Sequence, residues 1–309
     1  MKVLFVAGDP KPERWTRPIQ EHLPDAEVIA WDPNGGTVNA DYAIVWQPPA
    51  ALFEREPGLK AVFNLGAGVD GLMALPYLPP ELTVVRLEDA GMSAQMAEYV
   101  LHQVVDISRG MARYRGQQAE ARWQIHRPTQ RHQWPVGVMG LGQIGQRVAR
   151  TLAALDYPVS GWSRSAHQLE GVTTYTGTED LDRFLGATRV LVNTLPLTEQ
   201  TRDLIDHRLL GKLQADAVVI NVGRGEHLVD QDLLQALDDG RVSHAVLDVF
   251  RQEPLPAEHP FWRHPSITIT PHVSARTLRD TTIEQISTKI RDHAAGRAIS
   301  GVVDRSRGY

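Results

Sequence analysis

The 309-residue chain contains no cysteine. Disulfide bonds, thiol nucleophiles and zinc or iron–sulfur sites with cysteine ligands are therefore excluded. The chain also has no excess of basic residues, because 32 lysines and arginines stand against 37 aspartates and glutamates, for a formal net charge of −5. Without a polybasic face, nucleic acid and anionic membranes are not expected partners. These absences favour a protein of small-molecule metabolism.

Long hydrophobic runs are absent as well. No stretch approaches the roughly 20 apolar residues that a membrane span needs. The first residues, "MKVLFVAGDP", hold an apolar run of strand length, which is too short for the core of a signal peptide. We therefore expect a cytoplasmic protein. The composition, with 42% hydrophobic and 22% charged residues, is ordinary for a globular chain, and its length suits about two domains.

Short apolar runs alternate with helix-length intervals in two regions of the chain. The first hundred residues contain "KVLFVAG", "YAIVW" and "KAVFNLGAG", and the alternation restarts at Pro135 with "VGVMG", "AVVINVG" and "SITITPH". Strands spaced in this way indicate parallel βαβ units. We predict an α/β protein with two doubly wound parallel sheets, one domain formed by residues 1–99 plus 278–309 and the other by residues 100–277.

Three segments have helical character. "SAQMAEYVLHQVVDISRGMARYRGQQ" predicts one long connecting helix, with apolar residues at helical spacing from Met96 to Ile107. "DQDLLQALDDG" opens on Asp230, a residue suited to capping, and closes on Gly240. "RTLRDTTIEQISTKIRDHAAG" predicts a final helix that returns the chain to the first domain.

A glycine-rich loop follows the strand at the start of the second region. "VGVMGLGQIGQRVARTLAAL" has a G-x-G-x-x-G pattern between a strand and a helix, with the loop formed by Gly140, Leu141, Gly142, Gln143, Ile144 and Gly145. Such glycines permit a tight turn and let a pyrophosphate approach the helix N-terminus. The alternative is a glycine-rich turn without a ligand, which the strand–loop–helix context disfavours. The loop therefore predicts a bound dinucleotide.

The end of the next strand bears on which dinucleotide is bound. A cofactor with a free ribose 2′-hydroxyl calls for an acidic residue there, about 20 residues after the loop. The strand "PVSGW" instead runs into Ser163, Arg164 and Ser165. An arginine flanked by hydroxyls can bind a 2′-phosphate, so we predict NADP(H) in preference to NAD(H). A solvated surface arginine is the alternative.

Three charged side chains follow three later strands. Arg224 follows "AVVINVG", Glu253 follows "HAVLDVF" and His272 follows "SITIT". Ligands of open parallel sheets bind outside the carboxyl ends of the strands, so all three are expected on the side of the dinucleotide. Each alone has an ordinary alternative as a loop or surface residue. Together, beside a nucleotide loop, they favour a hydride-transfer site.

Reduction of a 2-oxo acid gives each of these groups a role. The carbonyl oxygen needs a proton, which the imidazole of His272 can donate near neutral pH. A carboxylate at Glu253 would stabilise the charged imidazole and orient it. Arg224 offers a planar fork for the substrate carboxylate and the carbonyl oxygen.

These residues resemble the D-2-hydroxyacid dehydrogenase family. The matching pieces are "GLGQIG", "LPLTEQTR", "NVGRG", "LDVFRQEPL" and "TITPHVSA", in the family's order and spacing. "VWQPP", "KAVFNLGAGVDG", "LEDAGMSAQMAEY" and "VDRSRGY" look like the glyoxylate/hydroxypyruvate reductase A branch. The resemblance implies a flavodoxin-like substrate domain, a Rossmann NADP-binding domain and NADPH-dependent reduction of glyoxylate to glycolate and of hydroxypyruvate to glycerate.

The resemblance also implies further site residues. The implied catalytic residues are Arg224, Glu253 and His272. Cofactor contacts beyond the glycine loop and residues 163–165 are implied at Leu195, Pro196, Val222, Gly223, Arg224, Asp248, His272 and Ser274. Substrate contacts are implied at Trp46, Ala67, Gly68, Val69, Arg224 and His272, with the backbone amides of residues 67–69 holding the substrate carboxylate. Family members are typically dimers, so a homodimer is expected, and Trp123 is a candidate to reach the partner's site. Trp46 and Trp123 could equally be ordinary core or interface residues.

Two other functions stay open, and a metal site is not expected. One rival is a dinucleotide-sensing binding protein that kept this fold, since fold does not determine function. The other is an NAD-dependent relative that oxidises formate or phosphite, against which residues 163–165 argue. The remaining histidines lack metal-binding spacing and have no cysteine companions. Those considered are His126, His132, His244, His259 and His264.

Overall fold

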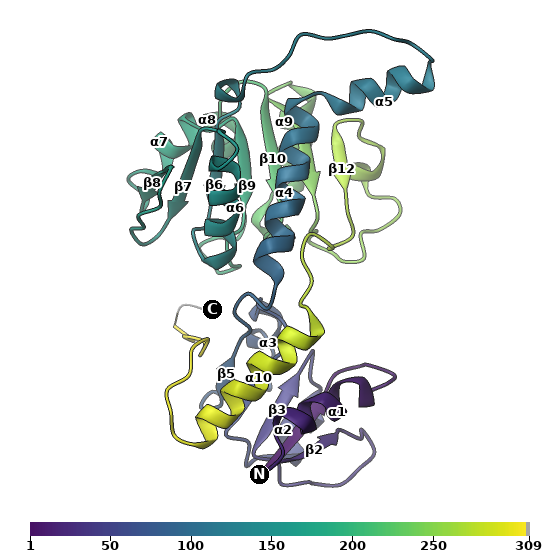
Figure 1. Cartoon of the computed structure of the whole chain (residues 1–309), viewed down its shortest axis with the longest axis vertical. Helices are drawn as coiled ribbons and strands as arrows, with labels where there is room; N and C mark the ends of the chain where they lie inside the picture. Colours follow the sequence, from purple (N-terminus) through teal and green to yellow (C-terminus); the bar gives the residue numbers. More distant parts are fainter. Residues whose placement is uncertain (307–309) are drawn as a thin grey trace. The chain divides into compact units, whose positions relative to one another are not determined.

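The computed structural model describes residues 1–306 and contains two compact α/β units, each built on one parallel sheet (Figure 1). Unit 1 comprises Met1–Gly91 and the chain from Thr277 onward, and unit 2 comprises Met92–Arg276. Every strand pairing in both sheets is parallel, which confirms the prediction of two doubly wound parallel sheets. No helix within residues 1–306 combines the length and apolar character needed to cross a bilayer.

The sheet of unit 1 has five strands in the order β2-β1-β3-β4-β5, which is the flavodoxin-like order. Its central strands are apolar except for Lys2 and Asn64 at strand ends, because helices or loops bury both faces of a parallel sheet. The strands are β1 (Lys2–Val6), β2 (Glu27–Ala30), β3 (Tyr42–Val45), β4 (Ala61–Asn64) and β5 (Thr83–Val85).

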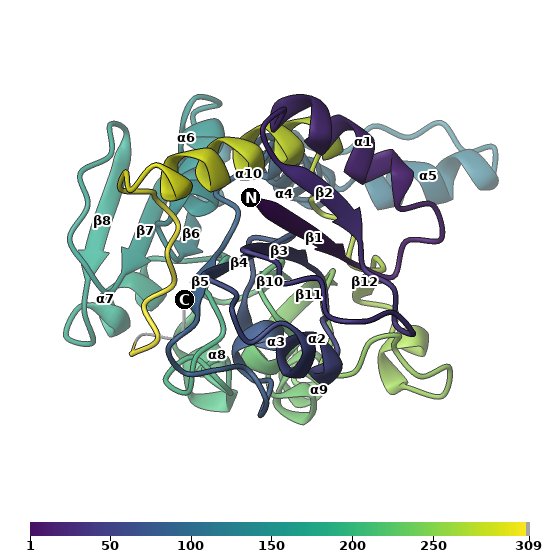
Figure 2. The same cartoon turned by 90° about the horizontal axis from the view of Figure 1, so that it is seen from below.

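The described part of unit 1 contains four helices. They are α1 (Glu13–His22), α2 (Ala50–Arg55), α3 (Asp70–Met73) and α10 (Arg279–Ala294). The last helix lies beside the first on one face of the sheet, as Figure 2 shows. Ile283, Ile286 and Ile290 of α10 are buried against Phe63 and other apolar side chains of that face. The C-terminal helix is thus part of the core of unit 1.

The sheet of unit 2 has seven strands in the order β12-β11-β10-β9-β6-β7-β8. Counted from its own first strand, this is the Rossmann order 3-2-1-4-5-6 with one more strand at the far edge, and the order reverses between β6 and β9. The strands are β6 (Val136–Met139), β7 (Val159–Ser163), β8 (Val172–Thr176), β9 (Val190–Asn193), β10 (Ala217–Asn221), β11 (Val242–Leu247) and β12 (Ile267–Ile269).

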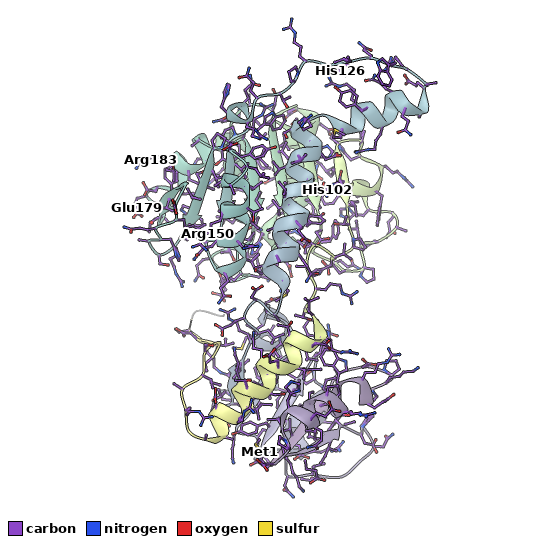
Figure 3. The ribbon with its side chains drawn as sticks, viewed as in Figure 1. Met1, His102, His126, Arg150, Glu179 and Arg183 are labelled. Carbon is purple, nitrogen blue, oxygen red and sulfur yellow. The ribbon has the colours of Figure 1, made fainter. Side chains whose placement is uncertain are left out.

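Helices cover both faces of this sheet, and unit 2 contains six helices in all. They are α4 (Met92–Ser108), α5 (Met111–Ala119), α6 (Gln143–Ala153), α7 (Leu181–Gly186), α8 (His207–Lys212) and α9 (Asp230–Asp238). Three short 3₁₀ turns join them, η1 (Arg131–Gln133), η2 (Gly225–His227) and η3 (Pro260–Arg263). Helices α4 and α6 pack closely on one face and are marked in Figure 3 by His102 and Arg150.

Three expectations about local structure need correction. The single long helix is wrong, because Gly110 adopts φ +62° and separates α4 from α5. Asp230 does not cap α9: the cap position is Val229, and the Asp230 carboxylate instead faces Arg251 and His259. Strand β8 was not expected, because "VTTYT" is a threonine-rich edge strand without an apolar run. Gly240 does end its helix, with φ +70°.

Candidate active site

The glycine-rich loop lies between β6 and α6, at the point where the strand order of unit 2 reverses. Gly140 adopts φ +97°, which favours glycine. A Cβ on Gly145 would lie 1.8 Å from the carbonyl oxygen of Gly140, so only glycine lets helix and turn pack this closely. A Cβ on Gly142 would meet nothing within 4 Å. That open space at a helix N-terminus is what a close-approaching pyrophosphate requires.

The other residues of this loop divide into buried and exposed positions. The side chain of Leu141 is buried and would lie 2.6 Å from a Cβ on Gly161, so Leu141 packs the loop onto β7. Gln143 is exposed and Ile144 is half-buried. Thr194, which follows β9, donates its hydroxyl to the carbonyl oxygens of Met139 and Gly140 at 3.0 and 2.9 Å. Sequence reasoning missed Thr194, although it braces the loop from the neighbouring strand.

Residues 163–165 follow β7, the strand beside the glycine loop. Ser163 is buried, and its hydroxyl donates to the carbonyl oxygen of Ser165 at 2.8 Å. Arg164 and Ser165 are exposed. The Ser165 hydroxyl lies 3.5 Å from Nε2 of His167, whose Nδ1 lies 3.5 Å from the Gln146 amide of α6. The segment therefore presents an arginine and a hydroxyl to solvent beside the first helix of the Rossmann sheet.

Three adjacent strands carry the predicted catalytic residues. β10, β11 and β12 are neighbours in the sheet and precede Arg224, Glu253 and His272 respectively. Nδ1 of His272 lies 2.8 Å from Oε2 of Glu253, and both side chains are partly exposed, by 46% and 36%. The other oxygen, Oε1, accepts the backbone N–H of Phe250 at 3.0 Å. The carboxylate thus orients the imidazole and is itself held by its own loop.

His272 has an unusual backbone conformation, with φ +53°. A non-glycine residue in this region is uncommon and is held there by its surroundings. Its N–H donates to the carbonyl oxygen of Asp248 at 2.8 Å. The buried Asp248 carboxylate accepts from the Thr270 hydroxyl at 2.5 Å and from the backbone N–H groups of Val273 and Ser274 at 2.9 and 2.8 Å. Asp248 and Ser274 therefore fix the segment that carries His272.

Tyr99 of α4 completes this support. Its hydroxyl lies 2.6 Å from Oγ1 of Thr270, and because Thr270 donates to Asp248, the tyrosine donates to the threonine. Burial, assisted by the negative charge of Asp248, raises the pKa of Tyr99 to about 12. The tyrosine therefore stays protonated at neutral pH and keeps donating.

Arg224 is held in a tight loop. Its Nη1 donates to the carbonyl oxygen of Gly223 at 2.8 Å. The next residue, Gly225, has no room for a side chain, because a Cβ would lie 1.9 Å from the carbonyl carbon of Phe250 and 2.3 Å from the backbone nitrogen of Arg251. The loops bearing Arg224 and Glu253 are thus in direct backbone contact.

The remaining predicted cofactor positions lie in the loops around this edge. Val222 is buried beside Gly223, whose Cβ would crowd the Asn193 amide at 2.9 Å and the Leu195 carbonyl oxygen at 3.1 Å. The carbonyl oxygen of Pro196 accepts the Thr201 hydroxyl at 2.8 Å. Leu195–Pro196 and residues 222–224 therefore lie against each other.

The predicted substrate contacts Trp46 and residues 67–69 lie in unit 1. Trp46 is 47% exposed, and its ring covers Gly66, where a Cβ would come within 2.7 Å of it. The Asn64 amide donates to the carbonyl oxygens of Gly66 and Gly68 at 3.0 and 2.9 Å, which shapes the loop that contains Ala67 and leads into the buried Val69. Trp123, in the segment after α5 of unit 2, is 95% exposed.

Sequence reasoning did not single out His227. Its side chain is completely buried on η2, three residues after Arg224, and hydrogen-bonds both to Arg224 and to the 193–196 segment. The available signal was a histidine placed within a glycine-rich strand-end loop. His126, labelled in Figure 3, is instead bonded to Gln117 at 2.6 Å. Over residues 1–306, no three His, Asp or Glu side chains are grouped so as to hold a metal ion.

A Rossmann sheet with a glycine loop at its switch point is the architecture of dinucleotide-dependent oxidoreductases. The model of the D-isomer specific 2-hydroxyacid dehydrogenase family, NAD binding domain, matches residues 101–274. The chain belongs to this family and is an oxidoreductase that uses a nicotinamide dinucleotide.

Individual relatives resemble the whole chain. A protein of Yersinia enterocolitica named glyoxylate/hydroxypyruvate reductase A is 42% identical, with 100% of both chains covered. A D-isomer specific 2-hydroxyacid dehydrogenase of Xanthobacter autotrophicus Py2, solved with NADPH and MES, is similar with a TM-score of 0.94 and 37% identity, over 100% of this chain and 99% of that one. An NADPH-dependent glyoxylate/hydroxypyruvate reductase of Sinorhizobium meliloti, solved with NADP and sulfate, has a TM-score of 0.90 and 36% identity over the same shares.

Proposed function

We propose that this enzyme reduces small 2-oxo acids, glyoxylate to glycolate and hydroxypyruvate to glycerate, with NADPH. The observation that carries the proposal is the hydrogen-bonded pair of His272 and Glu253 at the carboxyl edge of the sheet that also bears the glycine loop. The full-length likeness to reductases that are named for these two substrates supports the choice of acid.

Each group of the pair has a defined part in this reaction. Bound NADPH supplies a hydride to the carbonyl carbon. Because Nδ1 of His272 faces the Glu253 carboxylate at 2.8 Å, Nε2 is the nitrogen that donates the proton to the carbonyl oxygen. The carboxylate holds the orientation of the ring. Arg224 binds the substrate carboxylate through its planar fork.

Unit 1 is proposed as the substrate domain and unit 2 as the cofactor domain. The backbone amides of Ala67, Gly68 and Val69 would hold the substrate carboxylate, and Trp46 would restrict the size of the acid. Within unit 2, Arg224 and His272 are the proposed substrate contacts. We propose a cytoplasmic homodimer as the working form, in which Trp123 reaches the partner's site.

NADP(H) is the proposed cofactor in preference to NAD(H). Arg164 and Ser165 are exposed at the end of β7, where the 2′-phosphate of a dinucleotide on the glycine loop would lie. Two similar structures were solved with NADPH or NADP. Arg164→Ala should lower kcat/KM with NADPH and leave that with NADH nearly unchanged. An unaltered ratio between the two cofactors would remove this assignment.

The function is tested by following NADPH oxidation with glyoxylate, hydroxypyruvate and a panel of larger 2-oxo acids. We expect turnover with the two small acids. His272→Ala and Glu253→Gln should lower kcat by roughly 10²- to 10⁴-fold, the range for general acid catalysis, while NADPH still binds. Arg224→Ala should raise KM for the acid as well as lower kcat, because it has both tasks.

A matched control is available in His207, an exposed histidine of α8 whose Nδ1 lies 3.4 Å from the Asp232 carboxylate and which has no part in the proposed site. His207→Ala should keep the activity of the unaltered enzyme. If His272→Ala also keeps it across pH, His272 is not the proton donor. If the unaltered chain binds NADPH and turns over no 2-oxo acid, the dinucleotide-sensing role replaces the reductase.

A further inference from the structure

His227 is a buried polar residue that the proposed chemistry does not use. Its side chain has no exposed surface, although histidine is seldom enclosed without a specific set of partners. Nδ1 lies 3.2 Å from the backbone nitrogen of Arg224 and 2.8 Å from Nδ2 of Asn193, and Nε2 lies 3.2 Å from the carbonyl oxygen of Pro196.

These partners determine which nitrogen of the ring carries the proton. A backbone N–H and an amide NH₂ both donate, so Nδ1 must accept. A carbonyl oxygen only accepts, so Nε2 must carry the hydrogen. The orientation of the Asn193 amide is fixed independently, because its oxygen accepts the N–H of Leu195 at 3.2 Å and its nitrogen also donates to Asn221 at 2.9 Å. His227 is therefore a neutral imidazole with one accepting and one donating end.

The two ends reach two different functional loops. Nδ1 of His227 accepts the backbone N–H of Arg224, and the carbonyl oxygen of Arg224 accepts the Asn221 amide at 2.9 Å. The peptide groups on both sides of the Arg224 Cα are therefore hydrogen-bonded to buried side chains. The donating end holds the carbonyl oxygen of Pro196, in the segment proposed to contact the cofactor. A Cβ at Gly223 would lie only 3.1 Å from Nδ1, so the ring and the loop are in close contact.

We propose that His227 is a positioning residue that sets the substrate-binding Arg224 and the cofactor-contacting Leu195–Pro196 segment relative to each other through its two ring nitrogens. This inference rests on the proposed function for the roles of the two loops. An apolar residue of similar volume would fill the space and bond neither loop. Two buried groups would then lose their partner, which is costly for each.

Two substitutions separate the two ends of the ring. In His227→Asn the shorter amide places its oxygen near Nδ1 and keeps the bond to Arg224 but loses the one to Pro196. In His227→Gln the longer amide reaches the Nε2 position, keeps Pro196 and leaves the N–H of Arg224 unmatched. We expect His227→Asn to raise the Kd for NADPH by roughly tenfold with KM for glyoxylate nearly unchanged, the size of one lost buried hydrogen bond.

His227→Gln should have the opposite effect on the two constants. KM for glyoxylate should rise by roughly tenfold and the Kd for NADPH should stay within about twofold, because only the Arg224 side is released. Kd is measured by fluorescence titration with NADPH alone and needs no turnover. His227→Leu should impair both constants.

The control for a merely structural role is Ser108→Ala. It removes another buried hydrogen bond of unit 2, between Ser108 and Tyr157 at 3.1 Å, and should lower Tm without altering either constant. If the Asn and Gln variants lose thermal stability but keep both constants, or change both constants alike, His227 only fills the core and the proposal fails.

One more variant covers the case in which the His227 variants do not fold. Thr201→Val removes a second hydrogen bond to the Pro196 carbonyl oxygen that His227 holds, the one from the Thr201 hydroxyl at 2.8 Å, and should weaken NADPH binding without raising KM for glyoxylate. An unchanged NADPH affinity there overturns the proposal. Failure of the proposed function would look different, since the unaltered enzyme would then bind NADPH without reducing glyoxylate.

Discussion

Replacement of Gly142 by alanine should weaken dinucleotide binding and leave the fold intact. Gly142 precedes α6 with φ −68° and ψ −174°, an extended conformation that alanine adopts without strain. No heavy atom outside Gly142 and its two chain neighbours lies within 4 Å of the position a Cβ would take. The unliganded protein therefore has room for the methyl group. We expect the free energy of unfolding to change by no more than about 0.5 kcal/mol, as for surface substitutions away from special features.

The bound state differs, because the added methyl would occupy the space into which the pyrophosphate must come. Forcing an extra methyl group into a closely packed contact costs about 1–3 kcal/mol. At 1.4 kcal/mol for each factor of ten, the Kd for NADPH should rise by roughly 5- to 150-fold. KM for the oxo acid, measured at saturating NADPH, should change much less, because Gly142 contacts only the cofactor in the proposed site.

Gly145→Ala is the contrasting substitution in the same loop. Its Cβ would lie 1.8 Å from the Gly140 carbonyl oxygen and 2.7 Å from Oγ1 of Thr194, both well inside the 3.0 Å that real Cβ contacts essentially never cross. The turn and the helix must therefore move apart even without cofactor. We expect destabilisation by at least about 1–3 kcal/mol, which lowers Tm by roughly 2–12 °C for a unit of this size.

Thermal unfolding and NADPH titration of the two variants test both statements. Gly142→Ala should keep its Tm and lose affinity, and Gly145→Ala should lose Tm. A folded Gly142→Ala protein that binds NADPH as tightly as the unaltered enzyme would show that the pyrophosphate does not approach this backbone. Equal melting of all three proteins would show that the loop is not packed against α6 as described.

Three further substitutions test the support around the site. Asp248→Asn replaces a carboxylate that accepts from three donors by an amide with one oxygen, so we expect a loss of about 1–3 kcal/mol in calorimetry together with a lower kcat. Arg251→Met removes the hydrogen bond from Nε to the Leu228 carbonyl oxygen at 2.8 Å and the ion pair with Asp203. It should lower kcat/KM more than Arg251→Lys, because the loops that bear Arg224 and Glu253 are then held together less firmly. Burial raises the pKa of Asp230, and the positive charge of Arg251 only partly offsets this effect. Because the pKa of this carboxyl is higher in the folded than in the unfolded state, the folded protein loses stability as the pH rises through the folded-state pKa. Asp230→Asn should therefore raise the free energy of unfolding at neutral pH, with the gain vanishing below about pH 4 in denaturant titrations.

Local sequence patterns were sufficient for the layered fold and for the meeting of two candidate side chains at one edge of a sheet. Apolar runs of strand length between helix-length intervals predict parallel βαβ units, because both faces of such a sheet are buried. The rule that ligands meet the carboxyl ends of strands then predicted that Glu253 and His272 emerge at one edge, and they lie 2.8 Å apart. The glycine motif was equally readable, because its steric demand is expressed within a few consecutive residues.

Features that depend on contacts distant in the chain were beyond such patterns. Strand β8 forms at the sheet edge from threonine-rich sequence, because backbone pairing with β7 compensates for its few apolar side chains. Gly110 interrupts what the periodicity presents as one helix. Asp248 stays a predicted cofactor contact, and the sequence did not show that its buried carboxylate holds the segment of His272 from 22 to 26 positions away.

His227 is the clearest example of a residue whose contacts only the tertiary structure determines. In the chain it is one histidine among 12, without spacing that marks it. Its role follows from the packing of β9 beside β10, which brings Asn193 and Pro196 onto a ring that also receives the Arg224 backbone. Short-range periodicity specifies which residues face a core, whereas the hydrogen-bond partners of a buried polar group arise only when separate strands come together.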